Sequence, residues 1–386
     1  MLASPSTSVH STPRDWLINV LGGDAPRPPP WARASDAAVV DVLDAARAEG
    51  VAVAVFYALR QKPDWQALPE ALQTGLTNAA KQGIAWELAS QAEVIRALQA
   101  IASAGIDALA LKGAALAHLL YPEPQCRPRG DTDLLVADRQ TADRIYALLQ
   151  PLGFRKHLGV EGHYISHQFS CTKSGPQGIS ITFDIHWRLS NANLLAQRLT
   201  FADLWAERRP LPALGPTASA PSAHHALIHA LFHRAWHLGE GDPDRLIWLY
   251  DIHLLCQSLD ANDWKRFVDE ASRCRLQPLC RDGLEDIYAL FGTNVPDAVN
   301  RALSSVPSRG PLSQLQIKRP GIRRKLVDLL SLPTWPQRLT WMREYAFPDA
   351  AYMQRRFGAD TRWKLLAAYI SRGLGVHGRG RRRKAP

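Results

Sequence analysis

Two aspartates separated by one residue come directly before an apolar run, and this stretch constrains the fold most. Residues 131–136 read Asp-Thr-Asp-Leu-Leu-Val, and an apolar run of this length predicts a buried β-strand. Strand side chains alternate between faces, so Asp131 and Asp133 are expected to point the same way. Two carboxylates on one face repel each other unless a cation lies between them. The alternative is an exposed strand end with two solvated acids.

A second stretch brings a third carboxylate. Residues 179–187 alternate apolar and polar side chains, which predicts a half-buried strand. Asp184 and His186 fall on its polar face. If this strand neighbours the strand over 131–136, three carboxylates converge and suit a divalent cation. The alternative for Asp184 is a structural cap or ion pair.

The remaining patterns predict an α+β fold: a small mixed sheet with flanking helices and a mainly helical C-terminal half. Residues 106–111, 154–160 and 163–171 read as further strands, whereas helical spacing dominates residues 68–104 and the chain after 193. The expected division is a flexible leader over 1–33, N-terminal helices over 34–105, an α+β core over 106–192, a helical domain over 193–375 and a basic tail over 376–386. A linker is expected over 303–320.

Composition narrows the class of protein. The five cysteines form no Cys-x-x-Cys pair, so a disulfide framework or structural zinc site is not expected. No secretory signal or bilayer-length apolar run is present, and a cytoplasmic location is expected. The net charge of +10 is placed unevenly, but no basic stretch is interleaved with aromatics, so nucleic-acid binding is unsupported.

An amphipathic helix followed by a basic tail is predicted at the C-terminal end. A helix over 361–374 would set Trp363, Leu366, Ala367 and Ile370 on one face. We expect this face to pack on the protein, and the basic tail after it to be disordered and dispensable.

Several of these residues belong to short motifs that follow one another along the chain. It comprises Lys112-Gly113, a short apolar helix, Tyr121-Pro122, Arg127-Pro128-x-Gly130-Asp131-x-Asp133-Leu134-Leu135-Val136, Phe183-Asp184-Ile185-His186-Trp187, His233 and Arg245-Leu246-x-Trp248-Leu249-x-Asp251-Ile252. Over roughly residues 80–375 the chain resembles the uncharacterised bacterial nucleotidyltransferase family of the polymerase-beta-like superfamily. Thr132 departs from it, because the family usually has an apolar residue there.

The resemblance implies a site and a reaction. Asp131, Asp133 and Asp184 would hold Mg²⁺ or Mn²⁺, and these three carboxylates would also be the catalytic residues. The implied substrate-binding residues are Lys112, Gly113, Arg127, His186 and His233. The reaction would move a nucleoside monophosphate from an NTP, with ATP expected, to a hydroxyl of an unknown acceptor, in a polysaccharide or peptide natural-product pathway. The alternatives are an antitoxin-like enzyme that modifies a protein and a nucleotide-binding scaffold without catalysis.

The residues themselves support some of these roles and leave others open. Lys112 and Gly113 end a strand and open a helix, where free backbone N–H groups favour phosphate oxygens. Arg127 and Arg129 suit phosphate contact or an ion pair with the acidic strand about equally.

Two further patterns favour structural interpretations. The histidines that step by four over 225–237 could bind zinc or nickel, but helix packing is favoured. The Gly-x-Gly-x-x-Gly pattern over 373–378 follows a helix rather than a strand and is a chance match to a dinucleotide-binding fingerprint.

Overall fold

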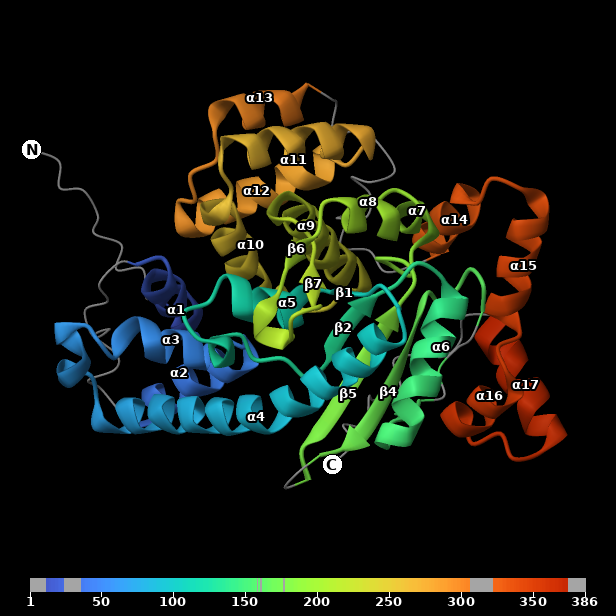
Figure 1. The fold of residues 1–386 in the computed structure, drawn as a ribbon, viewed down its shortest axis with the longest axis horizontal. Coiled ribbons are helices and arrows are strands. Elements are labelled where there is room, and N and C mark those ends of the chain that lie inside the picture. The colour runs from blue at the N-terminus through green and yellow to red at the C-terminus, as the bar shows by residue number, and fades with distance from the viewer. Residues whose placement is uncertain are drawn as a thin grey trace, which may run out of the picture.

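A five-stranded mixed sheet lies at the centre of the fold (Figure 1). The computed structural model describes residues 12–23, 36–157, 159, 162–175, 178–305 and 322–373. The strands are β1 (Leu109–Ala110), β2 (Thr132–Leu135), β3 (Arg155–Lys156), β4 (Gln168–Ser174) and β5 (Ser180–His186), in the order β1-β2-β5-β4-β3. β2 and β5 run parallel, and the other pairs are antiparallel. The predicted α+β class is confirmed.

Alternation along β5 separates a core face from a polar face, as its sequence predicts. Ile181, Phe183 and Ile185 are buried and join one hydrophobic cluster with Leu134 of β2. Side chains of α4 (Glu70–Ser103) and α6 (Arg139–Leu149) complete this cluster and cover the apolar face of the sheet. The polar face of β5 is therefore free to form a site.

The strand expected over 163–171 is displaced towards the C-terminus. β4 begins at Gln168, and the backbone N–H groups of His163 and Tyr164 instead donate to the Glu344 carboxylate, at 2.7 and 3.0 Å. Alternation in the sequence cannot reveal this long-range partner, which replaces the ladder hydrogen bonds. The strand expected over 106–111 is only the two residues of β1.

Helices form most of the rest of the described chain. Four helices precede the first strand in the sequence: α1 (Pro13–Leu21), α2 (Asp36–Ala48), α3 (Ala52–Leu59) and α4. Two more, α5 (Lys112–Leu119) and α6, connect strands of the sheet. After the sheet come α7 (Asn193–Ala196), α8 (Phe201–Ala206), the two-stranded ribbon β6 (Arg209–Pro210) and β7 (Ser219–Ala220), α9 (Ala223–Glu240), α10 (Leu246–Ser258), α11 (Ala261–Arg273), α12 (Gln277–Phe291) and α13 (Asp297–Ser304). The last helices are α14 (Ile322–Ser331), α15 (Trp335–Ala346), α16 (Ala350–Phe357) and α17 (Arg362–Gly373). None of the described helices is long and apolar enough to cross a membrane.

Helix α1 corrects part of the flexible leader expected over 1–33. Thr12 and Asp15 form a reciprocal capping box at its start, and Trp16 and Leu17 are buried in the largest hydrophobic cluster. Burial of this apolar face stabilises residues 13–21 as a helix against the fold. The remaining leader residues lie outside the described part, apart from 12, 22 and 23.

The packing expected for the last helix is also wrong. Trp363 is 80% exposed, Leu366 48% and Ile370 54%. α17 packs instead through Ala368 and its neighbours, in a small cluster with Met353 and Ala359. Helical spacing identifies two adjacent apolar stripes here but not which one meets a partner. The predicted linker after residue 305 and the basic tail lie outside the described residues.

Candidate active site

The parallel pairing of β2 with β5 sets two carboxylates side by side. Its register aligns Asp133 with Asp184. Paired residues on neighbouring strands point to the same face, and His186 shares it because it lies two residues after Asp184. One potential ligand atom from each of the three lies within 4.8 Å of the others.

This donor set fits a divalent cation. Carboxylate oxygens suit Mg²⁺ and Mn²⁺, whereas an imidazole ligand is less suited to Mg²⁺ than to a transition metal. His186 Nε2 lies 2.8 Å from Asp133 Oδ1, so the imidazole also fixes the orientation of that carboxylate. Within the described chain, no side chain donates a hydrogen bond to Asp184, whose oxygens can therefore face a ligand.

The third predicted carboxylate, Asp131, lies one residue before β2 and lines the same cleft. Partial burial, followed by the nearby carboxylates of Asp133 and Asp184, raises the pKa of Asp131 to about 6. It is not part of the group whose ligand atoms lie within 4.8 Å of one another. The strand begins at Thr132, so the alternation that would align Asp131 with Asp133 does not reach it. Its metal-binding role stays a prediction.

Lys112 lies at the junction between β1 and α5 in a strained conformation. Its φ is 48°, in the left-handed region that non-glycine residues rarely adopt. Its Nζ donates to Asp133 Oδ1 at 2.8 Å. Burial alone would lower the pKa of Lys112, but Asp133 outweighs burial and raises it. Against the effect of its own burial, Lys112 and His186 hold the pKa of Asp133 well below its usual range. Both residues are therefore charged at neutral pH.

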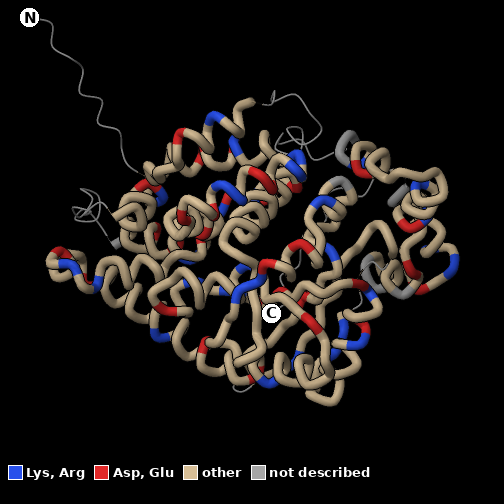
Figure 2. Tube along the Cα trace, turned by 45° about the horizontal axis from the view of Figure 1, so that its top comes forward, with Lys and Arg blue, Asp and Glu red and all other residues tan. Residues whose placement is uncertain are grey.

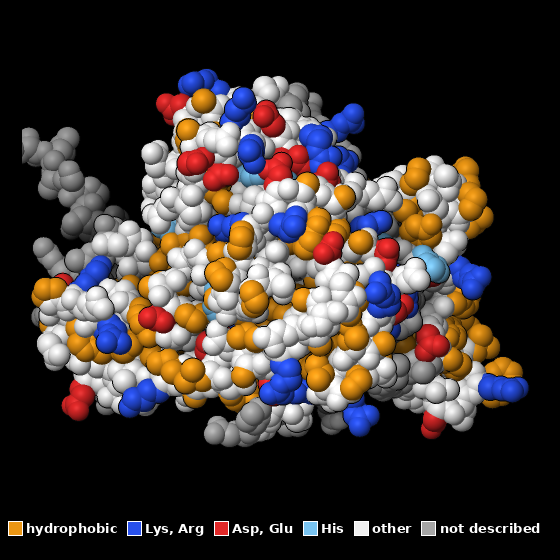
Figure 3. Space-filling model, viewed as in Figure 1, with side chains coloured by type: hydrophobic (Ala, Val, Ile, Leu, Met, Phe, Trp, Pro, Cys, Tyr) orange, Lys and Arg blue, Asp and Glu red, His pale blue; other side chains and the backbone are white. Residues whose placement is uncertain are grey.

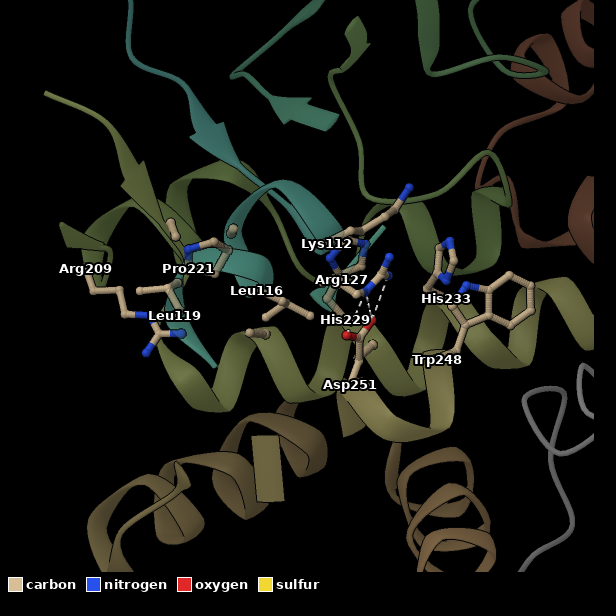
Figure 4. Close-up of a pocket in the computed structure, with 14 residues that line it drawn as sticks. Lys112, Leu116, Leu119, Arg127, Arg209, Pro221, His229, His233, Trp248 and Asp251 are labelled. Carbon is tan, nitrogen blue, oxygen red and sulfur yellow. Dashed lines mark hydrogen bonds and ion pairs between the residues drawn. The ribbon is translucent and has the colours of Figure 1, made fainter. Parts of the chain in front are cut away.

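Arg127 forms a buried ion pair rather than facing the acidic strand. Its Nε and Nη2 donate to the Asp251 carboxylate of α10 at 2.8 and 2.7 Å (Figure 4). Tyr121 Oη donates to the same carboxylate at 2.7 Å. Asp251 outweighs the opposing effect of burial and raises the pKa of Arg127. A Cβ at Gly113 would lie 3.2 Å from Arg127 Nη1, so this glycine makes room for the guanidinium. Arg127 thereby ties the β2 region to the helical half.

Arg129 also forms an ion pair with a carboxylate on a helix remote in sequence. Its Nη2 donates to Glu87 Oε1 of α4 at 2.8 Å, and its guanidinium lies over the Trp86 ring. Neither arginine pairs with Asp131 or Asp133, which was the structural alternative that the sequence left open. Both partners come from helices remote in sequence.

A cleft of about 600 Å³ opens in front of the carboxylates. One wall is basic, with Lys112, Arg127 and Arg245. The wall from α9 and α10 is aromatic, and its lining residues there are Phe232, His233, Trp236, His237 and Trp248. The cleft therefore combines acids, cations and flat rings in a volume suited to a small-molecule ligand.

A comparison with known protein families assigns the chain to one of them. The sequence profile of a family described as "uncharacterised nucleotidyltransferase" matches residues 35–292. The chain belongs to this nucleotidyltransferase family. The match begins and ends earlier than the resemblance over 80–375 predicts, and residues 293–386 lie beyond it.

Similar solved structures include an antigenic nucleotidyltransferase-like protein from Paracoccidioides brasiliensis. It is 17% identical, covers 55% of this chain and 97% of its own, and has a TM-score of 0.38. No curated protein matches the sequence significantly.

In this member of the family the histidines of α9 lie at the junction between the sheet and the helical half. His233 lines the cleft with its ring centroid 5.4 Å from that of Trp248, and His237 Nδ1 lies 2.8 Å from Asp242 Oδ2. Burial lowers the pKa of His225 to about 4 and that of His229 to about 3. Among the described residues the only group of three potential metal ligands is the one at Asp133, so none lies along this helix.

Sequence reasoning missed the residues that support the candidate site from a distance. Asp251 was quoted within a motif but given no role, and Glu87 was not singled out at all. Glu87 is buried on a helix whose other buried positions are apolar apart from Ser90, and a charged residue at a core-spaced position was the available signal. The aromatic wall carried no comparable signal, because Trp236 and Trp248 read as ordinary helix-packing residues.

Proposed function

We propose that this protein transfers a nucleoside monophosphate from an NTP to a hydroxyl group of an acceptor, with release of pyrophosphate. The observation that carries the proposal is the register of β2 with β5, which sets Asp133 beside Asp184 at the floor of a basic and aromatic cleft. Family membership supports the reaction class, and this geometry supports the choice of residues.

Asp133, Asp184 and His186 would hold a divalent cation, with Mg²⁺ or Mn²⁺ proposed. When bound, such an ion polarises phosphoryl oxygens and stabilises the charge that develops on them. Asp184 orients the acceptor hydroxyl and accepts its proton, since its carboxylate is not held by a described donor. Asp131, at the rim of the same cleft, is proposed as an additional ligand.

Lys112 is proposed to neutralise Asp133 and to contact the triphosphate. An ammonium has three donors, and the bond to Asp133 uses one of them. Its strained backbone conformation directs the side chain towards Asp133. Strained conformations of this kind are often found at functional sites. The Gly113 backbone at the start of α5 and the Arg127 guanidinium complete the proposed phosphate side, while His233 and the neighbouring rings form the opposite wall.

A direct test uses glycerol as a surrogate hydroxyl acceptor. The full-length protein is incubated with Mg²⁺ or Mn²⁺, each of the four common NTPs and excess glycerol, and pyrophosphate and the nucleotidyl-glycerol adduct are measured. ATP is the expected donor. Asp184→Asn should reduce the rate about 1,000-fold while leaving the melting temperature unchanged, because metal-assisted charge stabilisation is worth several kcal/mol.

Asp143→Asn on the exposed surface of α6 is the matched control and should keep full activity. Calorimetric titration with Mg²⁺ and NTP separates the alternatives. NTP binding without pyrophosphate release in any condition would favour the non-catalytic scaffold, and absence of NTP binding would defeat the proposal.

A further inference from the structure

Helices α14–α17 expose apolar side chains that the proposed reaction does not use. Thirteen large apolar side chains are exposed in the described chain, and nine of them lie on these four helices or the turns between them. They are Leu326, Leu330, Trp335, Leu339, Met342, Phe347, Trp363, Leu366 and Ile370. We call this set the α14–α17 surface. Because it lies beyond the family match, the catalytic fold does not account for it.

The exposed side chains form stripes rather than isolated positions. On α15 the exposed residues Trp335, Leu339 and Met342 recur at steps of four and three, which places them on one side of that helix. Trp363, Leu366 and Ile370 do the same on α17. Figure 3 shows hydrophobic side chains gathered along the edge of the molecule that these helices form. Apolar patches of this kind mark interaction sites.

Positive charge is concentrated in the same part of the chain. Residues 306–386 contain 18 Lys and Arg against 4 Asp and Glu, a net charge of +14. Since the whole chain carries +10, residues 1–305 carry a net charge of −4. Figure 2 shows acidic and basic positions interspersed over the described helices and strands. Residues 322–373, which include α14–α17, contain 10 Lys and Arg against 4 Asp and Glu, a net charge of +6, and five further positive charges fall within residues 379–384.

We propose that the α14–α17 surface binds the face of an anionic lipid bilayer. The apolar stripes and their tryptophans would enter the headgroup region, where tryptophan is favoured, and the basic residues would meet the lipid phosphates. Stable attachment of a peripheral protein takes two signals, and residues 322–373 have both exposed apolar stripes and a net charge of +6.

The net charge and the exposed apolar stripes together favour a lipid bilayer over a second copy of the chain and over nucleic acid. A second copy of the chain would bring another +6 from residues 322–373 against the first, which opposes pairing through the same surface. Nucleic acid would account for the charge but not for exposed Leu339, Leu366 and Ile370 in stripes. An anionic bilayer complements both features. The proposal does not depend on the proposed reaction, because a phosphoryl-transfer assay and a lipid-binding assay report on separate surfaces.

Vesicle flotation of the full-length protein tests the proposal. The vesicles are pure phosphatidylcholine, or phosphatidylcholine with about one third phosphatidylglycerol. The wild-type protein should float with the anionic vesicles only, and less at high salt. Trp363→Ser combined with Leu366→Ser and Ile370→Ser should lower the bound fraction about tenfold. Removal of residues 374–386 should weaken binding and its dependence on salt.

The matched control changes equally exposed apolar residues elsewhere. Leu88 is 68% exposed and Tyr288 65%, so Leu88→Ser with Tyr288→Ser should leave flotation unchanged. All substituted side chains are exposed, and unchanged melting curves would show that each variant is folded. Three results would overturn the proposal: no flotation of the wild type, flotation that the triple variant retains, or a dimer that the triple variant dissociates. Retention of nucleic acid at the same ionic strength without any lipid binding would also overturn it.

Discussion

The chain up to residue 305 and helices α14–α17 use hydrophobic residues in opposite ways. In the first part, two large clusters bury side chains from α1 through α13 around the sheet. In α14–α17 the separate buried cluster contains only Met353, Ala359 and Ala368, while large apolar side chains face outward. The charges differ in sign as well, −4 for residues 1–305 against +6 for residues 322–373. We therefore propose that the first part positions a site and that the second presents a surface.

The largest predicted effect concerns the buried ion pair that joins the sheet region to α10. Arg127→Leu or Asp251→Asn should lower the free energy of unfolding by about 3–5 kcal/mol, because each leaves the other charge buried without its partner. Denaturant unfolding monitored by circular dichroism measures the change.

The exposed pair of Asp44 and Arg47 provides the control for this experiment. Asp44→Asn should change stability by less than about 1 kcal/mol. Should Arg127→Leu unfold like the wild type but lose NTP affinity, Arg127 would be primarily a phosphate ligand, as the family resemblance implies.

The contrast between Asp184 and Arg127 shows how far the sequence could lead. Asp184 was placed on the polar face of β5 because a period of two is a local property, and the structure has it there. Whether β5 neighbours β2 depends on the chain between them, so only the family resemblance could suggest it. For Arg127 the family resemblance implies a phosphate role, while the residues themselves leave phosphate contact and an ion pair with the acidic strand about equally open. Its partner lies 124 residues away, and no local pattern reports such a pairing.

The same limit explains the helices at the end of the chain. The sequence indicates α17 correctly, but a helix with two adjacent apolar stripes has two possible buried faces. Leu365 and Tyr369 pack in the small cluster, whereas Trp363 is 80% exposed. The choice depends on α16, which itself folds against α17. A sequence can predict an amphipathic helix without predicting which neighbour covers it.

Acid should destabilise the first part and spare α14–α17. Burial lowers the pKa of His167 and His225 to about 4 each, from an unfolded value near 6.5. Between these values the unfolded chain takes up protons that the folded protein excludes, so stability is full above pH 6.5 and falls towards pH 4. Each histidine contributes on the order of 2–3 kcal/mol to this loss. The raised pKa of Asp131 acts in the opposite direction, but as a single group.

Melting temperatures at about pH 7.5 and 5 measure this effect. His225→Gln should reduce the difference between them, and His157→Gln, at an exposed position, should not. Residues 322–373 contain no histidine. The protection factors of amides in α15 and α17, which are corrected for the intrinsic pH dependence of exchange, should therefore change less with pH than those in α9. Equal acid sensitivity of the two parts would show that they unfold as one unit.

The smallest predicted effect lies where the two parts meet. The Glu344 carboxylate of α15 accepts the backbone N–H groups of His163 and Tyr164, and Asp328 of α14 accepts a hydrogen bond from Asn193 at 3.1 Å. Glu344→Ala removes the first contact and should cost about 1–2 kcal/mol locally, because both bonds are made to a charged acceptor at a partly exposed site. Amide exchange in α15 should therefore speed up about tenfold, while exchange in β2 and β5 stays unchanged.

Arg343→Ala on the exposed side of the same helix is the matched control and should alter neither. An increase in exchange that spreads into the strands carrying Asp133 and Asp184 would mean that α14–α17 stabilise the site as well as presenting a surface.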